Sequence, residues 1–335
     1  MNQPRTNLLW LQSGGCGGCT MSLLGAEQPT LFEALDAFGI ELLWHASLSG
    51  GQGPGLAELI EQIEAGELKL DLLCIEGAVM TGPGGTGLFH VLAGTDTPMM
   101  AVIERLAKRA GHVIAVGSCS AFGGINRSNN NPAEAIGLQY IGEQPGGLLG
   151  SDYRSDMALP VVNVSGCPAH PDWILQSLQA LSQGMLDQTE LDEYQRPRFY
   201  TEHLAHHGCP RNEFYEYKAS AEQPCQSGCL MENLGCQATQ AHADCNIRLW
   251  NGGGSCPKAG YACINCTAPE FEEPGHPFGE TPKLAGVPVG LPTDMPKAWF
   301  IALSSLSKAA TPKRLKVNAT SETVKIVPNI YKKRR

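Results

Sequence analysis

The residues best suited to do chemistry in this sequence are its cysteines, of which there are 13. Cys16 and Cys19 lie in the glycine-rich segment GGCGGCT, directly after a strand-like run and directly before a helix-like run. A CxxC pair at such a junction could be a redox dithiol, half of a zinc site or part of an iron–sulfur site. The positions of the other cysteines have to separate these alternatives.

Two more cysteines follow strand-like runs. Cys119 comes after HVIAVGS, and Cys167 comes after LPVVNVSG. Ligands of parallel sheets collect beyond the carboxyl ends of the strands, so these two thiols are expected beside Cys16 and Cys19. Structural zinc usually takes two close pairs of ligands within a short module, which makes zinc the second choice for a set spread over most of a domain.

A second set combines a histidine with three cysteines in the motifs HHGCPR and CLMENLGC. Its expected members are His206, Cys209, Cys229 and Cys236. Such a set can bind zinc or an iron–sulfur cluster. His207 is the rival of His206, and Cys225 in PCQSGC could replace Cys229, although we favour a spare thiol.

A third set lies in CNIRLWNGGGSCPKAGYACINC and could hold another cluster. It consists of Cys245, Cys256, Cys263 and Cys266. Three cysteine-rich sites, in a chain with no recognisable set of nucleophile, base and orienting group, indicate a path for electrons. Cys74 is different, because it lies inside the apolar run LDLLCIEG and is predicted to pack as a core side chain.

The elements that must position these thiols alternate along the first half of the chain. Apolar runs predict strands near 7–12, 40–44, 70–75, 112–116 and 160–164. Between them, MMAVIERLAKRAG and PDWILQSLQALSQG have helical periodicity. Strands that alternate with helices predict an α/β fold with a doubly wound parallel sheet.

The periodicity fades after about residue 191, which suggests two domains. Residues 1–190 are expected to form the α/β domain with the first thiol set, and residues 191–335 an irregular domain with the other two. Metal clusters would cross-link a segment that cannot bury a large core. The basic residues 332–335 are expected to be a flexible tail.

Charge and hydropathy limit the partners and the location. The formal net charge of −9 argues against nucleic-acid binding, which depends on clustered Lys and Arg. The apolar stretch 298–306 is about half the roughly 20 residues that span a bilayer, so no membrane span is expected. We see no export signal and therefore expect a cytoplasmic protein, in which 13 cysteines suit metal ligation better than disulfides.

Six motifs in order carry a family resemblance: LLWLQSGGCGGCT, GSCSAFGG, SGCPAHPD, HHGCPR, CLMENLGC and CINC. Over about residues 7–270 the chain closely resembles the small, electron-transferring subunit of nickel–iron hydrogenases. The resemblance implies a flavodoxin-like domain followed by an irregular cluster-binding domain. It also implies the reaction H2 to two protons and two electrons, with the nickel–iron centre in a separate large subunit.

The resemblance also implies which residues hold which cluster. The proximal 4Fe-4S cluster would take Cys16, Cys19, Cys119 and Cys167, and the distal 4Fe-4S cluster would take His206, Cys209, Cys229 and Cys236. The medial cluster would take Cys245, Cys263 and Cys266. Many members have a 3Fe-4S medial cluster and a proline where a fourth cysteine would come. Here Cys256 precedes Pro257 in that region, so we favour 4Fe-4S over 3Fe-4S.

Within the family, CGGCTMSLL looks most like the cytoplasmic branch that includes hydrogen-sensing regulatory enzymes. That branch implies a signalling kinase or a redox acceptor as partner and allows a dimer of heterodimers. Glu76 in IEGAV matches a glutamate common in the family, expected near the proximal site unless it is an ordinary solvated or capping carboxylate. The alternatives are the small subunit of a cytoplasmic uptake hydrogenase, a separate iron–sulfur electron carrier and a zinc-stapled interaction protein.

Overall fold

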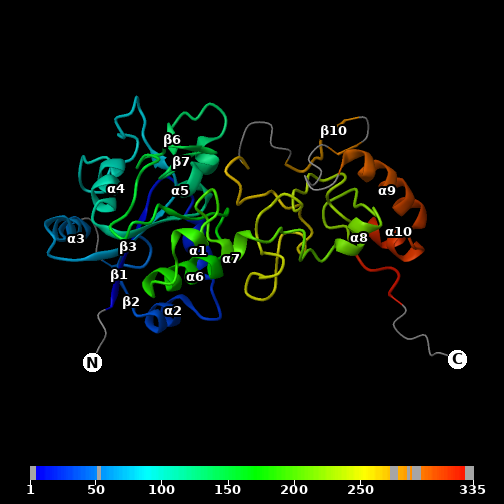
Figure 1. Ribbon diagram of the computed structural model, residues 1–335, viewed down its shortest axis with the longest axis horizontal. Helices are drawn as coiled ribbons and strands as arrows, with labels where there is room; N and C mark the ends of the chain where they lie inside the picture. Colours follow the sequence, from blue (N-terminus) through cyan, green and yellow to red (C-terminus); the bar gives the residue numbers. More distant parts are fainter. Residues whose placement is uncertain (1–4, 51–53, 272–277, 285–286, 289–295, 329–335) are drawn as a thin grey trace. The chain divides into compact units, whose positions relative to one another are not determined.

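The structure, a computed structural model, describes residues 5–50, 54–271, 278–284, 287–288 and 296–328 (Figure 1). It divides into two compact units. The first contains residues 1–201 and 266–274, and the second contains residues 202–265 and 275–335. The expected boundary at residue 190 lies before this division, and the basic tail 332–335 lies outside the described residues.

The first unit is built on a parallel sheet of five strands. These are β1 (Thr6–Gln12), β2 (Ile40–His45), β3 (Leu70–Glu76), β5 (Ala110–Val116) and β9 (Val162–Val164). Their spatial order is β2-β1-β3-β5-β9, and each neighbouring pair is parallel. This is the flavodoxin-like order of doubly wound sheets. The α/β fold predicted from the alternating pattern is therefore confirmed.

Helices cover both faces of this sheet (Figure 1). On one face, α3 (Pro54–Ala65) contacts α4 (Met99–Ala107). On the other, α6 (Pro171–Ser182) contacts α1 (Gly18–Leu24) and α2 (Leu31–Phe38). The two helices predicted from periodicity are α4 and α6, and both are present.

Alternation along the strands explains why both faces are apolar. Leu9 and Leu11 of β1 belong to the same buried cluster as residues of α3 and α4. Leu8 and Trp10, which alternate with them along the strand and so lie on the opposite face, are buried as well. Cys74 pairs with Trp10 in the register of β1 and β3 and has no exposed surface. It is the core cysteine that the sequence predicted.

Short elements complete the first unit. They are β4 (Val79–Met80), α5 (Ser118–Phe122), η1 (Gly124–Arg127), β6 (Ala135–Ile136), β7 (Tyr140–Ile141), β8 (Gln144–Pro145), η2 (Gln188–Glu190) and α7 (Arg198–Thr201). Tyr200 of α7 stacks on Trp173 of α6, with ring centroids 4.3 Å apart, and is fully buried. This packing extends the first unit to Thr201.

The second unit has little regular structure before residue 297. Its elements are α8 (Asn212–Glu216), β10 (Lys283–Leu284), β11 (Val287–Pro288), α9 (Lys297–Ala310) and α10 (Lys313–Ala319). Leu315 of α10 is buried against Ala219. Across the described residues, no helix is both long enough and apolar enough to span a bilayer.

Candidate iron–sulfur ligand sites

Three loops at the carboxyl edge of the sheet bring the first thiol set together. Cys19 lies in the first turn of α1 after β1, Cys119 lies in α5 after β5, and Cys167 follows β9. The backbone N–H of Ala169 donates to the Cys19 sulfur at 3.5 Å, which ties the first loop to the third. Cys16 lies in the same turn as Cys19 but is exposed, whereas Cys19 is buried.

Two glycines leave room for these sulfurs. A Cβ atom on Gly117 would lie 2.5 Å from the Cys19 sulfur, and one on Gly124 would lie 2.6 Å from the Cys119 sulfur. Both glycines also have positive φ, at 85° and 56°. The backbone therefore makes a cradle around the thiols that a larger residue would fill.

The electrostatics of the Cys19 thiol suit a metal cluster. Burial raises its pKa, the Ala169 N–H opposes this, and the nearby charges of Glu76, Cys119 and Cys167 raise the pKa further. A bound metal ion displaces the proton of a buried thiol and stabilises the thiolate that remains, and iron does this directly. The donor set of this edge therefore fits an iron–sulfur cluster.

Glu76 lies beside this thiol set and is not a solvated surface carboxylate. It ends β3, between β1 and β5, and is only 3% exposed. Its carboxylate accepts the backbone N–H of Thr20 at 3.0 Å, the Thr20 hydroxyl, and the indole N–H of Trp10 at 3.2 Å. Glu76 therefore lies near Cys19, as expected, and it also caps the start of α1, which was the alternative interpretation.

The segment after Cys266 is fastened to the same edge. The Ser118 hydroxyl donates to the carbonyl of Cys266 at 2.6 Å, and Ser118 precedes Cys119 in the sequence. The carbonyl of Thr267 accepts from Ser165 at 3.0 Å and from the Arg196 guanidinium at 2.8 Å. One predicted medial ligand therefore lies next to the loop of a predicted proximal ligand.

In the second unit, one pocket is lined by all four members of the predicted distal set. It encloses about 320 Å³, counting the part open to solvent. Its walls include His206, Cys209, Cys229 and Cys236. The His206 backbone N–H donates to the carbonyl of Ala238 at 2.9 Å. The His206 and Tyr215 rings pack edge to face, with their centroids 4.4 Å apart. His207 and Cys225 are exposed and do not line this pocket.

The chemistry of this pocket also fits a cluster. Burial raises the pKa of the Cys209 and Cys236 thiols, and it raises the pKa of Cys229 to about 12. The Thr239 hydroxyl lines the pocket, is buried, and has no hydrogen-bond partner among the described residues. Inorganic sulfide or a thiolate would accept a hydrogen bond from this hydroxyl.

Arg211 was not singled out from the sequence, yet it organises this site. Its guanidinium is buried and donates to the carbonyls of Pro257 at 2.7 Å and Gly228 at 2.6 Å. It therefore joins the segment before Cys229 to the segment after Cys256, beside the thiols of the pocket. The arginine ends the HHGCPR motif, but sequence spacing does not show which carbonyls it reaches.

The predicted medial set is divided in the structure. Cys263 is buried with Ala238 and Ala241, and Cys245 packs against the same cluster. Cys256 is exposed and lies close enough to Cys236 to disfavour ionisation of that thiol. Cys266 belongs to the segment assigned to the first unit. The ligand set and its fourth member stay predictions.

Within the described ranges, no group of three or more His, Cys, Asp or Glu side chains is arranged to hold one metal ion. In a 4Fe-4S cluster each thiolate binds a different iron, so its ligands stand farther apart than those of a single ion. The thiol sets therefore match clusters better than mononuclear zinc.

Two family models match the chain. The NADH ubiquinone oxidoreductase 20 Kd subunit model covers residues 16–181. The model for the C-terminal part of NiFe/NiFeSe hydrogenase small subunits covers residues 200–279. They meet near the division between the two units at Thr201.

The curated relatives and solved structures that match the chain also include hydrogenases and hydrogenase small subunits. The small subunit of F420 non-reducing hydrogenase II from Methanosarcina mazei is 33% identical over 82% of this chain and 75% of its own length. The small subunit of the periplasmic NiFeSe hydrogenase from Desulfomicrobium baculatum is 32% identical over 81% and 86%. An actinobacterial-type NiFe-hydrogenase structure from Ralstonia eutropha matches with a TM-score of 0.75 and 26% identity over 93% of both chains.

Proposed function

This chain belongs to the nickel–iron hydrogenase small-subunit family, and on that premise we propose that it relays electrons through three iron–sulfur clusters in a hydrogen-sensing enzyme. Small subunits of this family transfer electrons and pair with a large subunit that carries the nickel–iron active site. The chain therefore contributes the electron path of an oxidoreductase and not its hydrogen-splitting centre.

The observation that supports the proposed relay is that Cys19, Cys119 and Cys167 lie close together at one edge of the sheet. The backbone carbonyl of Cys266 is hydrogen-bonded to the same edge. Each bound cluster would accept and release one electron at a time. The chain's own residues would hold the clusters, bury them from water and set the order in which they follow one another. Cys16, Cys19, Cys119 and Cys167 would hold the proximal 4Fe-4S cluster.

The distal pocket supports the second end of the relay. His206 and three thiols would hold a 4Fe-4S cluster there, with His206 half-buried on the wall shared with Tyr215. A medial cluster held by Cys245, Cys263, Cys266 and Cys256 would connect the two ends, as 4Fe-4S in preference to 3Fe-4S.

The test is anaerobic copurification of the chain with its native large subunit. We expect nickel near one per heterodimer, iron in the range of about ten or more on cluster arithmetic, and hydrogen-dependent dye reduction. Abundant iron without nickel or hydrogen activity would reassign the chain to a separate electron carrier. Zinc in place of iron would reject the clusters altogether.

The sensing role rests on the segment CGGCTMSLL and includes a cytoplasmic location and a signalling partner. We expect slow hydrogen-driven turnover, together with a hydrogen-dependent change in the activity of a signalling kinase of the same cell. Deleting the chain should then abolish the response of hydrogenase expression to H2. Fast turnover with unchanged gene expression would favour the uptake role.

A further inference from the structure

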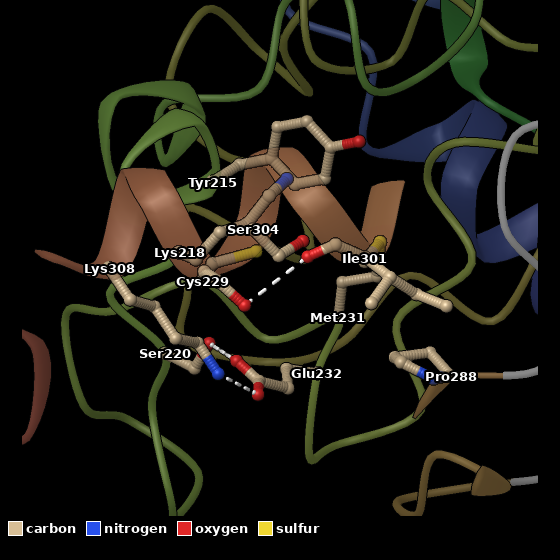
Figure 2. A pocket seen from close by; sticks show the side chains of 11 residues that line it. Tyr215, Lys218, Ser220, Cys229, Met231, Glu232, Pro288, Ile301, Ser304 and Lys308 are labelled. Atoms are coloured by element: carbon tan, nitrogen blue, oxygen red, sulfur yellow. Dashed lines mark hydrogen bonds and ion pairs between the residues drawn. The ribbon is translucent and has the colours of Figure 1, made fainter. Parts of the chain in front are cut away.

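A second pocket of the second unit lies between α9 and the loop that carries Cys229 (Figure 2). It encloses about 660 Å³, counting the part open to solvent. We call it the α9 pocket. Its lining residues used below are Tyr215, Lys218, Cys229, Met231, Ile301 and Ser304.

The α9 pocket shares a wall with the predicted distal site. Tyr215, Cys229 and Met231 line both pockets. A molecule in the α9 pocket would therefore be separated from a distal cluster by these side chains alone. Electron transfer weakens steeply with distance, so this is a favourable place for a molecule that takes electrons from the relay.

The walls of the α9 pocket combine apolar surface with hydrogen-bond donors. Met231, Ile301 and the ring of Tyr215 supply the apolar part. The Lys218 ammonium lies 3.6 Å from the centroid of the Tyr215 ring. The Ser304 hydroxyl is buried and has no hydrogen-bond partner in the described part of the chain. A planar conjugated ring with oxygen acceptors would satisfy both kinds of wall.

The single carboxylate of the lining is already occupied. Glu232 pairs with Lys308 at 2.5 Å and accepts the Ser220 hydroxyl at 2.5 Å. Figure 2 shows this cluster at one end of the pocket, and Lys218 and Ser304 nearer Cys229. The lining therefore carries two ammonium groups against one carboxylate, which favours a ligand with carbonyl or anionic oxygens.

We propose that the α9 pocket binds a planar conjugated electron acceptor with ring carbonyl oxygens, of the quinone class, an inference that rests on the proposed function. Splitting of H2 in the large subunit releases two protons to solvent and two electrons that reach the ring one at a time through the relay, and the reduced ring takes up two protons from solvent. Both carbonyls become hydroxyls, so the net change is H2 plus quinone to quinol. The hydrogenase family model ends at residue 279, so Ile301 and Ser304 come from outside the matched segment.

The test uses the native heterodimer with 1,4-naphthoquinone-2-sulfonate as acceptor. Ile301→Trp should fill the pocket, because Ile301 lines it and is 48% exposed, so the larger ring needs no core rearrangement. We expect about a tenfold rise in KM for the quinone, with hydrogen-driven methyl viologen reduction unchanged. The matched control is Leu303→Trp, which lies on the same helix, is 47% exposed and does not line the pocket.

Equilibrium dialysis of the quinone with the oxidised heterodimer, without H2, separates the two proposals. Wild type and Leu303→Trp should bind it, and Ile301→Trp and Ser304→Ala should bind it more weakly. If methyl viologen is not reduced by wild type, the proposed function fails and dialysis still decides the pocket. An unchanged KM and unchanged binding in Ile301→Trp, or equal effects in Leu303→Trp, would overturn the quinone site.

Discussion

Each of the two units of this chain is stabilised internally in a different way. The first has a five-stranded sheet and a continuous core of large aliphatic side chains such as Leu73 and Ile103. The described buried clusters of the second are small and rich in Ala, Cys and Met, as around Ala238 and Met231. A unit with so little aliphatic core needs other cross-links, and its thiols can supply them through iron.

The largest expected effect comes from removing the iron. Stripping the heterodimer with a chelator under oxidising conditions should unfold residues 202–265, because the clusters replace a core there. The sheet of the first unit should keep its amide protection, since its core needs no metal. Hydrogen exchange followed by mass spectrometry, with a mock-treated sample as control, measures both regions. Equal loss of protection in the two units would contradict the comparison.

The aliphatic core of the first unit should respond most to lost volume. Leu73 has no exposed surface, so Leu73→Ala should lower the free energy of unfolding of this unit by about 2–5 kcal/mol. Phe32→Ala is the control, because Phe32 is 63% exposed. Urea unfolding of the heterodimer gives both values. A cost for Leu73→Ala no larger than that of Phe32→Ala would show that the sheet core is not what holds this unit.

The second unit should respond more to lost hydrogen bonds. Arg211→Met leaves the carbonyls of Pro257 and Gly228 without their donor and should cost about 2–3 kcal/mol. It should also lower the iron retained per chain after gel filtration. Arg314→Met is the control, because its ion pair with Glu213 is partly solvated and such pairs contribute about 0–1 kcal/mol. Full iron retention in Arg211→Met would argue that the cluster alone joins these segments.

Acid should weaken the first unit through three of its buried and half-buried histidines, the smallest of the four effects. Burial lowers the pKa of His45, His90 and His112 below the ordinary 6.5. Below about pH 6.5 the unfolded chain therefore binds protons that the folded unit does not, and stability falls as the pH falls. The melting temperature should drop between about pH 7.5 and about pH 5.5. His112→Gln should reduce that drop, and an unchanged pH dependence in this variant would exclude His112 as a source.

The local sequence pattern was sufficient to predict the strands, the helices α4 and α6, and the core position of Cys74. Alternating and helical periodicities are properties of neighbouring residues, so they can be recognised in the sequence without knowledge of the fold. The rule that ligands gather at the carboxyl ends of parallel strands extended this to the meeting of Cys19, Cys119 and Cys167. A residue type and its place after a strand carried that prediction.

Contacts between distant segments were decided only by the tertiary structure. The hydrogen bond from Ser118 to Cys266, the carbonyls reached by Arg211, and the pocket between α9 and Cys229 each join residues far apart in the chain. The sequence contains those residues, but no periodicity or spacing states which of them meet. Which thiols share an edge was determined by the order of the strands, whereas what surrounds those thiols depended on how the irregular segments pack.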